Sequence, residues 1–184
     1  MLYFLRHGLD DEEYIGGWSD VDLVEEGVEQ VREICSLLGT LPIKKIISSD
    51  IKRAKTTSKI VSEYLNVPVE YSDKFRELDK GDITGMNKTL ALSLYPDYMD
   101  NVSVDTRYPN GESMIDLYER VKVLLDEISD WEDVLIVTHR GVINMIYFVM
   151  KNRLPDMDKK QFGVTHASVH EYNPKQKIIQ KIGG

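Results

Sequence analysis

Two histidines each follow a short apolar segment and have a glycine one or two positions later. His7 follows residues 2–6 (LYFLR), and His139 follows residues 134–138 (VLIVT). Ligands of open α/β sheets bind outside the carboxyl ends of the strands, where a nearby glycine lets backbone amides approach them. A single histidine at such a place is as often a structural residue as a ligand-binding one. Two with the same surroundings favour one shared site.

Arginines occur at the same kind of position. Arg6 directly precedes His7, and Arg53 falls in the first turn of a helix expected after a strand at 43–48. The partial positive charge of a helix N-terminus disfavours a cation there, so an anion in front of Arg53 is the better explanation. Two guanidinium groups, two imidazoles and helix-opening amides together suit a phosphoryl dianion.

This set of groups predicts phosphoryl chemistry. A neutral imidazole can attack phosphorus and form a covalent intermediate, which divides one displacement into two. A carboxylic acid can then protonate the leaving oxygen, for ~10²–10⁴-fold in rate. Glu77 and Asp79 are the candidate acids, although a loop carboxylate is more often plain surface. The chemistry requires no metal, and no cofactor is predicted.

Alternating strands and helices must position these groups. Apolar runs predict strands at 2–6, 43–48, 67–71 and 134–138, and a terminal pair at 167–172 and 177–182. Helical periodicity predicts helices at 24–38, from a cap at Asp50 to 65, at 87–94, from a cap at Ser113 to 129, and at 142–150. This alternation predicts an α/β fold with a mostly parallel sheet and an antiparallel strand at an edge.

The composition limits the function classes. The chain has 184 residues and a formal net charge of −8, which argues against nucleic acid and membrane surfaces as partners. Its one cysteine, Cys35, excludes an internal disulfide framework and fits a reducing interior. No targeting or membrane-spanning segment is recognisable, so we expect a cytoplasmic protein. We expect one domain over residues 1–184, with a short lid around 79–110 and an oligomeric state that the sequence leaves unknown.

Six motifs resemble those of the histidine phosphatase superfamily, the phosphoglycerate mutase-like proteins. Arg6-His7-Gly8 resembles the family signature, and residues 17–27, 48–57, 75–85, 111–113 and 137–141 resemble the motifs that follow it, in unchanged order. The resemblance implies a three-layer α/β/α sandwich with a mostly parallel central sheet and an antiparallel edge strand.

The resemblance also implies roles for individual residues. His7 would carry the phosphoryl group, Glu77 would protonate the leaving group and then activate water, and His139 would complete the catalytic set. Glu112 is a weaker candidate acid and Asp79 ranks below it. The residues expected to bind the phosphoryl group are Arg6, Arg53 and His139, with Arg140 as an added cation.

The chain departs from the family pattern after the signature. Leu9 and Asp10 stand where the family usually has Glu or Gln and then Thr, and acids follow at Asp11, Glu12 and Glu13. Acids so near an anion site repel substrate unless they face solvent or meet a cationic part of it.

Three functions remain open at this stage. We favour a metal-independent phosphomonoesterase acting through phosphohistidine on a small phosphorylated metabolite; the alternatives are a phosphoglycerate mutase-type transferase and a non-catalytic phospho-ligand binding module. Hydrolysis is favoured because the lid is short and net acidic, whereas a mutase must grip a second anionic group. The lid acids are Asp79, Asp82, Asp97, Asp100 and Asp105, against the bases Lys80, Lys88 and Arg107.

Other conspicuous residues receive simpler interpretations. His166 and His170, four apart on a predicted strand, are weak metal candidates because no further ligand accompanies them. Aromatic residues in the lid either stack on a substrate ring or pack on the body of the protein; they are Tyr95, Tyr98 and Tyr108. Core or rim packing is expected for Trp18, Trp131, Cys35 and residues 145–150.

Overall fold

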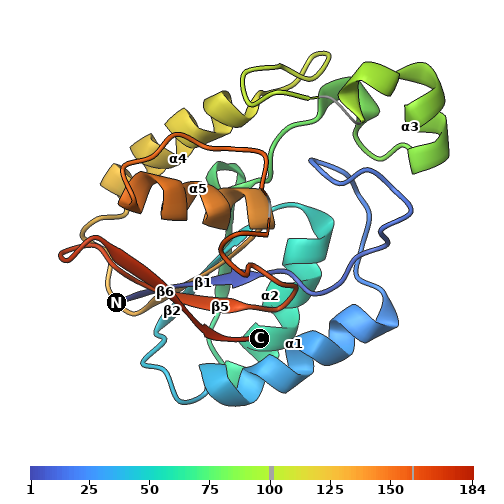
Figure 1. The fold of residues 1–184 in the computed structure, drawn as a ribbon. Coiled ribbons are helices and arrows are strands. Elements are labelled where there is room, and N and C mark those ends of the chain that lie inside the picture. Colours follow the sequence, from blue (N-terminus) through green and yellow to red (C-terminus); the bar gives the residue numbers. More distant parts are fainter. Residues whose placement is uncertain (100–101, 159) are drawn as a thin grey trace.

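A mixed β-sheet forms the middle layer of the protein in this computed structural model, which describes residues 1–99, 102–158 and 160–184 (Figure 1). The strand order is β3-β2-β4-β1-β5-β6. The first four strands run parallel, β5 runs antiparallel to β1, and β6 runs antiparallel to β5. The strands are β1 (Leu2–Arg6), β2 (Lys45–Ser49), β3 (Val69–Ser72), β4 (Val134–Thr138), β5 (Val169–Asn173) and β6 (Ile178–Gly183).

Helices cover both faces of the sheet. Figure 1 shows α4 and α5 above the sheet and α1 below it, and α2 packs in the same apolar cluster as α1. The α-helices are α1 (Glu25–Leu38), α2 (Lys52–Leu65), α3 (Lys88–Leu94), α4 (Met114–Glu127) and α5 (Arg140–Met150); short 3₁₀ helices are η1 (Asp73–Phe75), η2 (Gly81–Ile83) and η3 (Pro96–Tyr98). The predicted three-layer α/β/α sandwich is confirmed, with the one antiparallel strand next to the edge rather than at it.

Two apolar clusters hold the layers together. Along β1, Tyr3 and Leu5 pack with α1 and α2, while Leu2 and Phe4 pack with α4 and α5. This alternation is the expected consequence of a strand that is buried on both faces. Cys35 lies in the first cluster as a small buried residue, as predicted.

One predicted helix cap is wrong. Asp50 does not cap α2: the residue that precedes the helix is Ile51, and it makes no side-chain cap. The carboxylate of Asp50 instead accepts a hydrogen bond from Arg76 Nε at 2.6 Å. Because Arg76 is 26 positions along the chain, rules based on periodicity and capping could not predict this pair.

The cap at the start of α4 is confirmed. The hydroxyl of Ser113 accepts from the Asp116 backbone N–H at 3.1 Å, and Asp116 Oδ2 accepts from the Ser113 N–H at 2.8 Å. This reciprocal pair is a capping box, which satisfies two amides that the helix leaves unpaired.

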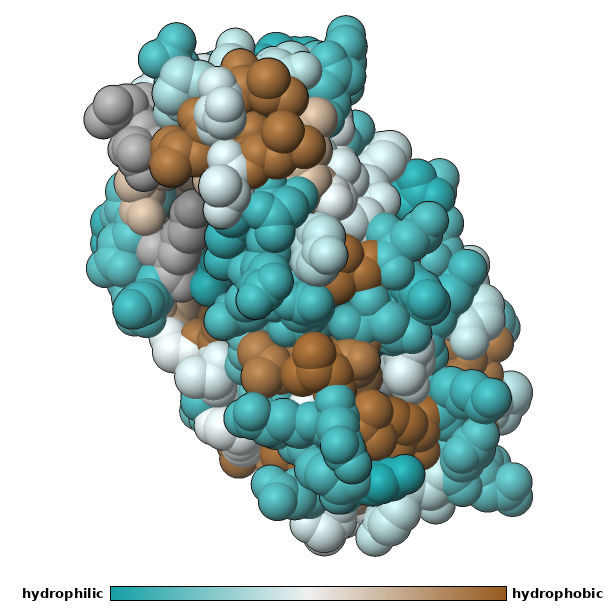
Figure 2. All heavy atoms as spheres, turned by 90° about the vertical axis from the view of Figure 1, so that its right-hand side faces the viewer, coloured by the Kyte–Doolittle hydropathy of each residue, from teal (hydrophilic) through white to brown (hydrophobic). Residues whose placement is uncertain are grey.

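The segment that lies above the sheet edge carries α3, as a helix one residue shorter than predicted. Its leucines Leu90, Leu92 and Leu94 are exposed, and Figure 2 shows an apolar patch at the top of the face that carries this helix. None of the helices in the described part of the chain has the length and apolar character needed to cross a bilayer.

Candidate active site

The two strand-end histidines lie side by side. β1 and β4 are neighbouring parallel strands in which Arg6 pairs with Thr138, so the residues that follow, His7 and His139, leave the sheet together. Their ring centroids are 5.2 Å apart, and both side chains are buried. The register of one strand pair therefore creates the imidazole pair.

Hydrogen bonds define the orientation of His7. Its Nδ1 lies 2.7 Å from the Gly8 carbonyl oxygen and must donate to it, while Arg53 Nε donates to His7 Nε2 at 3.2 Å. Nε2 therefore carries the lone pair. Burial, reinforced by the charge of Arg53, holds the pKa of His7 well below its usual range. The ring is a neutral imidazole at physiological pH, the form that attacks phosphorus.

His139 is held by the hydroxyl of Ser49. Its Nε2 lies 2.8 Å from that hydroxyl, and its buried Nδ1 has no hydrogen-bond partner within the described part of the chain. Burial, then the charge of Arg53, lowers the pKa of His139 well below its usual value. The tautomer in which Ser49 donates to Nε2 carries its proton on Nδ1, the ring nitrogen that is left for a phosphoryl oxygen.

Arg53 is a buried cation held by three groups. It is the second residue of α2 and 1% exposed. Besides its bond to His7, its Nη2 donates to the Gly17 carbonyl at 2.8 Å and its Nη1 to the Ser19 hydroxyl at 3.3 Å. These bonds hold the guanidinium beside the imidazole, so the charge is in place before any ligand arrives.

Two more arginines face the same space. Arg6 ends β1 and donates from Nη1 to the Val164 carbonyl at 2.9 Å. Burial, then the charge of Arg140, lowers the pKa of Arg6 to about 10, which leaves it charged at neutral pH. Arg140, the first residue of α5, lines the cavity beside it. Three guanidinium groups thus converge on one cavity, as expected for an anion site.

Glu77 reaches the cavity from the opposite side. Its Oε2 accepts from the backbone N–H of Gly141 at 3.1 Å, and its Oε1 accepts from the Leu78 N–H at 2.9 Å. A Cβ on Gly141 would lie 2.1 Å from Glu77 Oε1. A larger residue at 141 would therefore displace the Glu77 carboxylate from this position.

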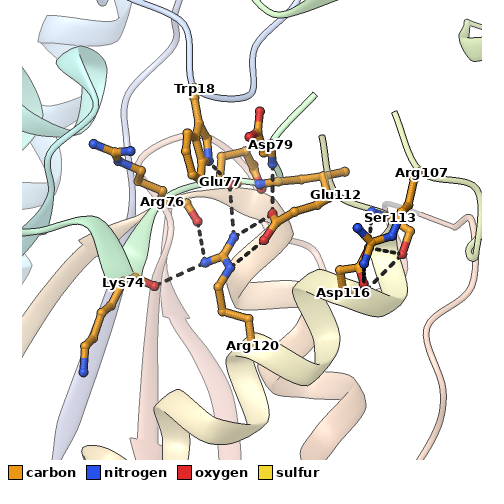
Figure 3. A network of polar contacts seen from close by, with 11 residues as sticks. Trp18, Lys74, Arg76, Glu77, Asp79, Arg107, Glu112, Ser113, Asp116 and Arg120 are labelled. Atoms are coloured by element: carbon orange, nitrogen blue, oxygen red, sulfur yellow. Dashed lines mark hydrogen bonds and ion pairs between the residues drawn. The ribbon is translucent and has the colours of Figure 1, made fainter. Parts of the chain in front are cut away.

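A salt-bridged pair holds the loop that carries Glu77 (Figure 3). Arg120 on α4 donates from Nε to Glu112 Oε1 at 2.9 Å and from Nη2 to Glu112 Oε2 at 2.9 Å. The same guanidinium donates to the carbonyl oxygens of Arg76 and Glu77, each at 3.2 Å. Trp18 Nε1 adds a bond to the Glu77 carbonyl at 2.7 Å. Glu112 thus supports the loop that carries Glu77. It does not line the cavity, although the sequence made it a candidate acid.

The cavity between these groups has a volume of about 210 Å³. Its wall is partly apolar, through residues that include Ile15, Leu78, Leu117 and Met145. Charged and polar residues of the wall beyond the arginines, His7 and Glu77 are Asp10, Glu12, Tyr14, Lys80, Lys88, Thr106, Tyr108 and Asn144. The predicted site residues Arg6, His7, Arg53, Glu77 and Arg140 line one cavity, with His139 buried beside His7.

The net negative charge of the lid does not describe the part of the lid that lines the cavity. The lid residues that line it include two cations, Lys80 and Lys88, and none of the four lid acids within the described residues. Asp100 lies outside those residues. The acids on the wall, besides Glu77, come from the loop after His7. Sequence order alone could not tell which lid side chains point inward.

Among the lid tyrosines only Tyr108 lines the cavity. Tyr98 packs between Tyr95 and Tyr108, with ring centroids 6.5 and 6.0 Å away. Trp18 lies at the rim, 39% exposed, with the Arg76 guanidinium 4.6 Å from its ring centroid. Tyr95 and Tyr98 also pack against the buried cluster that contains the α4 and α5 side chains, which agrees with packing of the lid on the body.

The pairing of His166 with His170 on one strand face is wrong. His166 precedes β5, and its ring centroid lies 5.7 Å from that of His7. His170 is buried in β5, where Nδ1 contacts the Tyr147 hydroxyl at 2.8 Å and Nε2 the Ser168 hydroxyl at 2.9 Å. Because His166 lies before β5 begins, its ring does not share a strand face with the ring of His170.

His166 brings a different set of possible metal ligands together. Ligand atoms of His7, Asp10 and His166 lie within 4.8 Å of one another. However, Arg53 donates to His7 Nε2 and Arg6 Nη2 contacts His166 Nε2, so a guanidinium group lies against each imidazole of this cluster. Two fixed positive charges beside the cluster disfavour a metal cation and favour an anion.

Sequence reasoning missed Arg120 as well as the place of His166. Arg120 lies on the predicted helix 113–129, but nothing in its spacing shows that it contacts the backbone of residues 74–77. The sequence offered one indication of this role. Glu112 stands eight positions before Arg120, so an acid there can pair with a cation in the first turns of the following helix.

Residues 2–183 match the model of the histidine phosphatase superfamily (branch 1). The chain is 31% identical over 159 residues to the uncharacterized phosphatase PhoE of Bacillus subtilis, covering 83% of this chain and 78% of that protein. It is also 31% identical over 135 residues to a probable phosphoglycerate mutase, GpmB, of Escherichia coli, covering 70% of this chain and 63% of that protein.

Solved structures show the same fold. A mycobacterial glucosyl-3-phosphoglycerate phosphatase superposes with a TM-score of 0.76 at 24% identity, covering 99% of this chain and 95% of that chain. The α-ribazole phosphatase of Shigella flexneri superposes with a TM-score of 0.80 at 22% identity, covering 99% and 94%. At these identities the likeness establishes the shared architecture alone.

Proposed function

The chain belongs to the histidine phosphatase superfamily, as its motifs led us to expect, and is an enzyme of the phosphatase type; we propose that it hydrolyses a small phosphorylated metabolite through a phosphohistidine on His7. The observation that carries this proposal is the convergence on one cavity of a neutral imidazole, guanidinium groups and a carboxyl group. The predictions of a cytoplasmic location and of no nucleic-acid partner go with it.

In the first step His7 Nε2 attacks the phosphorus atom of the phosphomonoester. The P–N bond forms while the bond from phosphorus to the leaving oxygen breaks, and Glu77 gives its proton to that oxygen. Arg6 and Arg53 stabilise the charge on the phosphoryl oxygens, and the Nδ1–H of His139 donates to one of them.

In the second step water takes the place of the alcohol. Glu77, now ionised, accepts a proton from water as the water oxygen attacks phosphorus, and the P–N bond breaks. Phosphate leaves, His7 is again neutral and Glu77 again carries a proton. The two amides that bond Glu77 keep its carboxyl group near the same point in both steps.

The cavity supports a small organic phosphate as the substrate class. Its volume of about 210 Å³ leaves limited room beyond the phosphoryl group. Tyr108 offers an aromatic face, and Lys80 and Lys88 offer cations at the lid side. The structural relatives include phosphatases named for a sugar phosphoglycerate and for ribazole phosphate, which makes both compound types first choices for screening.

The test is to trap the covalent intermediate. The protein is mixed with a ³²P-labelled phosphomonoester taken from a phosphate-release screen and is then quenched in alkali, where phosphohistidine survives. We expect label on the wild-type chain and none on His7→Asn. His170→Asn is the matched control, because it makes the same change at a buried histidine away from the cavity. Label on His7→Asn contradicts the assignment of the nucleophile.

The same screen separates the alternative functions. Exchange between 2- and 3-phosphoglycerate that is faster than phosphate release supports the mutase. Binding of phosphomonoesters with neither label nor turnover supports the binding module.

A further inference from the structure

A carboxylate lies inside the anion site. Asp10 lies three residues after His7 in the loop that leaves β1, and its backbone forms an isolated bridge with Leu23. Its side chain is 15% exposed and lines the cavity. Oδ2 is 3.4 Å from Arg53 Nε, and Oδ1 is 3.7 Å from His166 Nε2. The loop thus places the Asp10 carboxylate beside Arg53, the cation that contacts His7.

The position of this carboxylate overlaps the space that a phosphoryl group needs. A ligand oxygen of Asp10 lies within 4.8 Å of a ring nitrogen of His7. A phosphoryl group bonded to His7 Nε2 must place its oxygens beside that atom and against Arg53, whose Nε already faces both His7 and Asp10. Two anions that share one guanidinium at this range repel each other, and water screens them little in a buried site.

We propose that Asp10 determines which charge state of the site accepts the phosphoryl group: its ionised carboxylate competes with the phosphoryl dianion for Arg53, and binding tightens when Asp10 is neutral. The inference rests on the proposed function, because it concerns the same cavity. It assigns to Asp10 the control of affinity, and it leaves nucleophilic attack to His7.

The environment of Asp10 agrees with this role. Burial raises the pKa of the Asp10 carboxyl above its usual range, although Arg53 acts in the opposite direction. His166 does not neutralise Asp10, because burial and the charge of Arg6 lower the pKa of His166 to about 3. His166 contacts Asp10 directly. The titratable and charged groups that share the cavity wall with Asp10 are Arg6, His7, Glu12, Tyr14, Arg53, Glu77, Lys80, Lys88, Tyr108 and Arg140.

The sign of the pH dependence follows. Above its pKa Asp10 is charged and opposes the dianion, and below that pKa the opposition is lost. Protonation of phosphate free in solution is the same in the measurements on wild type and on an Asp10 variant. The ratio of their dissociation constants therefore isolates the contribution of Asp10, and this ratio falls as the pH is lowered.

The experiment measures binding of inorganic phosphate by calorimetry to wild type, Asp10→Asn and Glu13→Gln between pH 5 and pH 8. Glu13→Gln removes the same charge from an exposed side chain of the same loop. We expect Asp10→Asn to bind phosphate ~10-fold or more tightly than wild type at pH 8, with a smaller ratio at pH 5. Glu13→Gln is expected to stay within about twofold of wild type, because solvent screens exposed charges.

Three outcomes overturn the inference: Asp10→Asn binds phosphate no more tightly than wild type, Glu13→Gln matches its gain, or the ratio does not depend on pH. Asp10→Ala, which removes the carboxylate without leaving an amide, must change affinity in the same direction. A wild type that hydrolyses phosphomonoesters while Asp10→Asn shows no gain refutes this inference alone. A wild type that neither binds phosphate nor hydrolyses any phosphomonoester refutes the proposed function as well.

Discussion

The floor and the roof of the cavity are built by different kinds of contact. The floor consists of the ends of β1 and β4 and the start of α2, where backbone bonds and strand register place His7, His139 and Arg53. The roof is the segment 75–112, in which the described residues form no strand; it is joined to the rest of the chain by side chains such as Arg120 and by backbone bonds to the loop 13–15. The floor is therefore fixed by the sheet, whereas the position of the roof depends on contacts between loops and on individual side chains.

The largest expected effect comes from the floor. His7→Asn removes the nucleophile while the strand that carries it remains, so we expect kcat to fall ~10³-fold or more with every substrate. Phosphate release under saturating substrate measures it. A variant that keeps a tenth of the wild-type rate would show that the imidazole is not the attacking group.

Substitution of the acid in the roof gives a smaller and selective loss. Glu77→Gln is expected to lower kcat/KM ~10²–10⁴-fold for an alkyl phosphate and much less for a nitrophenyl phosphate, whose leaving group needs little protonation. Asp79→Asn is the matched control, since Asp79 Oδ1 accepts from the Gly81 N–H and does not line the cavity. Equal losses with both substrates would move the acid role away from Glu77.

Arg120 tests whether the roof depends on one side chain. Arg120→Met keeps much of the side-chain length but loses the bonds to Glu112 and to the carbonyls of the acid loop, so we expect kcat/KM for alkyl phosphates to fall about tenfold. The loss with nitrophenyl phosphate should be smaller, as for Glu77→Gln. The affinity for inorganic phosphate should not change, because Arg6 and Arg53 belong to the floor.

The control for this variant is Arg107→Met, which removes a guanidinium paired with Asp116 on the surface. If Arg120→Met reduced alkyl turnover, aryl turnover and phosphate affinity to the same extent, Arg120 would have only a general structural role.

The smallest effect is expected where the roof meets α4. Ser113→Ala removes the side-chain acceptor of the capping box and should cost about 1 kcal/mol of unfolding free energy, measured by urea denaturation. Activity should stay within about twofold of wild type, because the helix is also held by its buried face. A loss of turnover as large as that of Arg120→Met would show that the cap also positions Glu112.

The sequence predicted the floor well because its rules are local. Apolar runs mark the strands, and a residue that follows a parallel strand must lie at the ligand-binding edge of the sheet. His7, His139 and Arg53 were found in this way. The predicted strands and helices agree with the structure to within about two residues. The predicted cap at Asp50 is wrong, because its side chain pairs with Arg76.

The tertiary structure alone decided the walls and the roof. Net acidity of the lid suggested an acidic cover, yet Lys80 and Lys88 are the lid charges that face the cavity. His166 was expected on a strand face with His170 and instead lies beside His7. In both cases the direction of a loop side chain is set by partners far away in the chain, which no spacing rule encodes.

The amino-acid sequence by itself therefore determined the chemical groups, the sheet edge that collects them and the family. It did so because strand and helix periodicity is a property of neighbouring residues. Whether a loop acid such as Asp10 faces solvent or the nucleophile was decided only by the packing of its loop against Leu23 and Arg53. That choice arises from long-range contacts, and it places a negative charge inside a site made for anions.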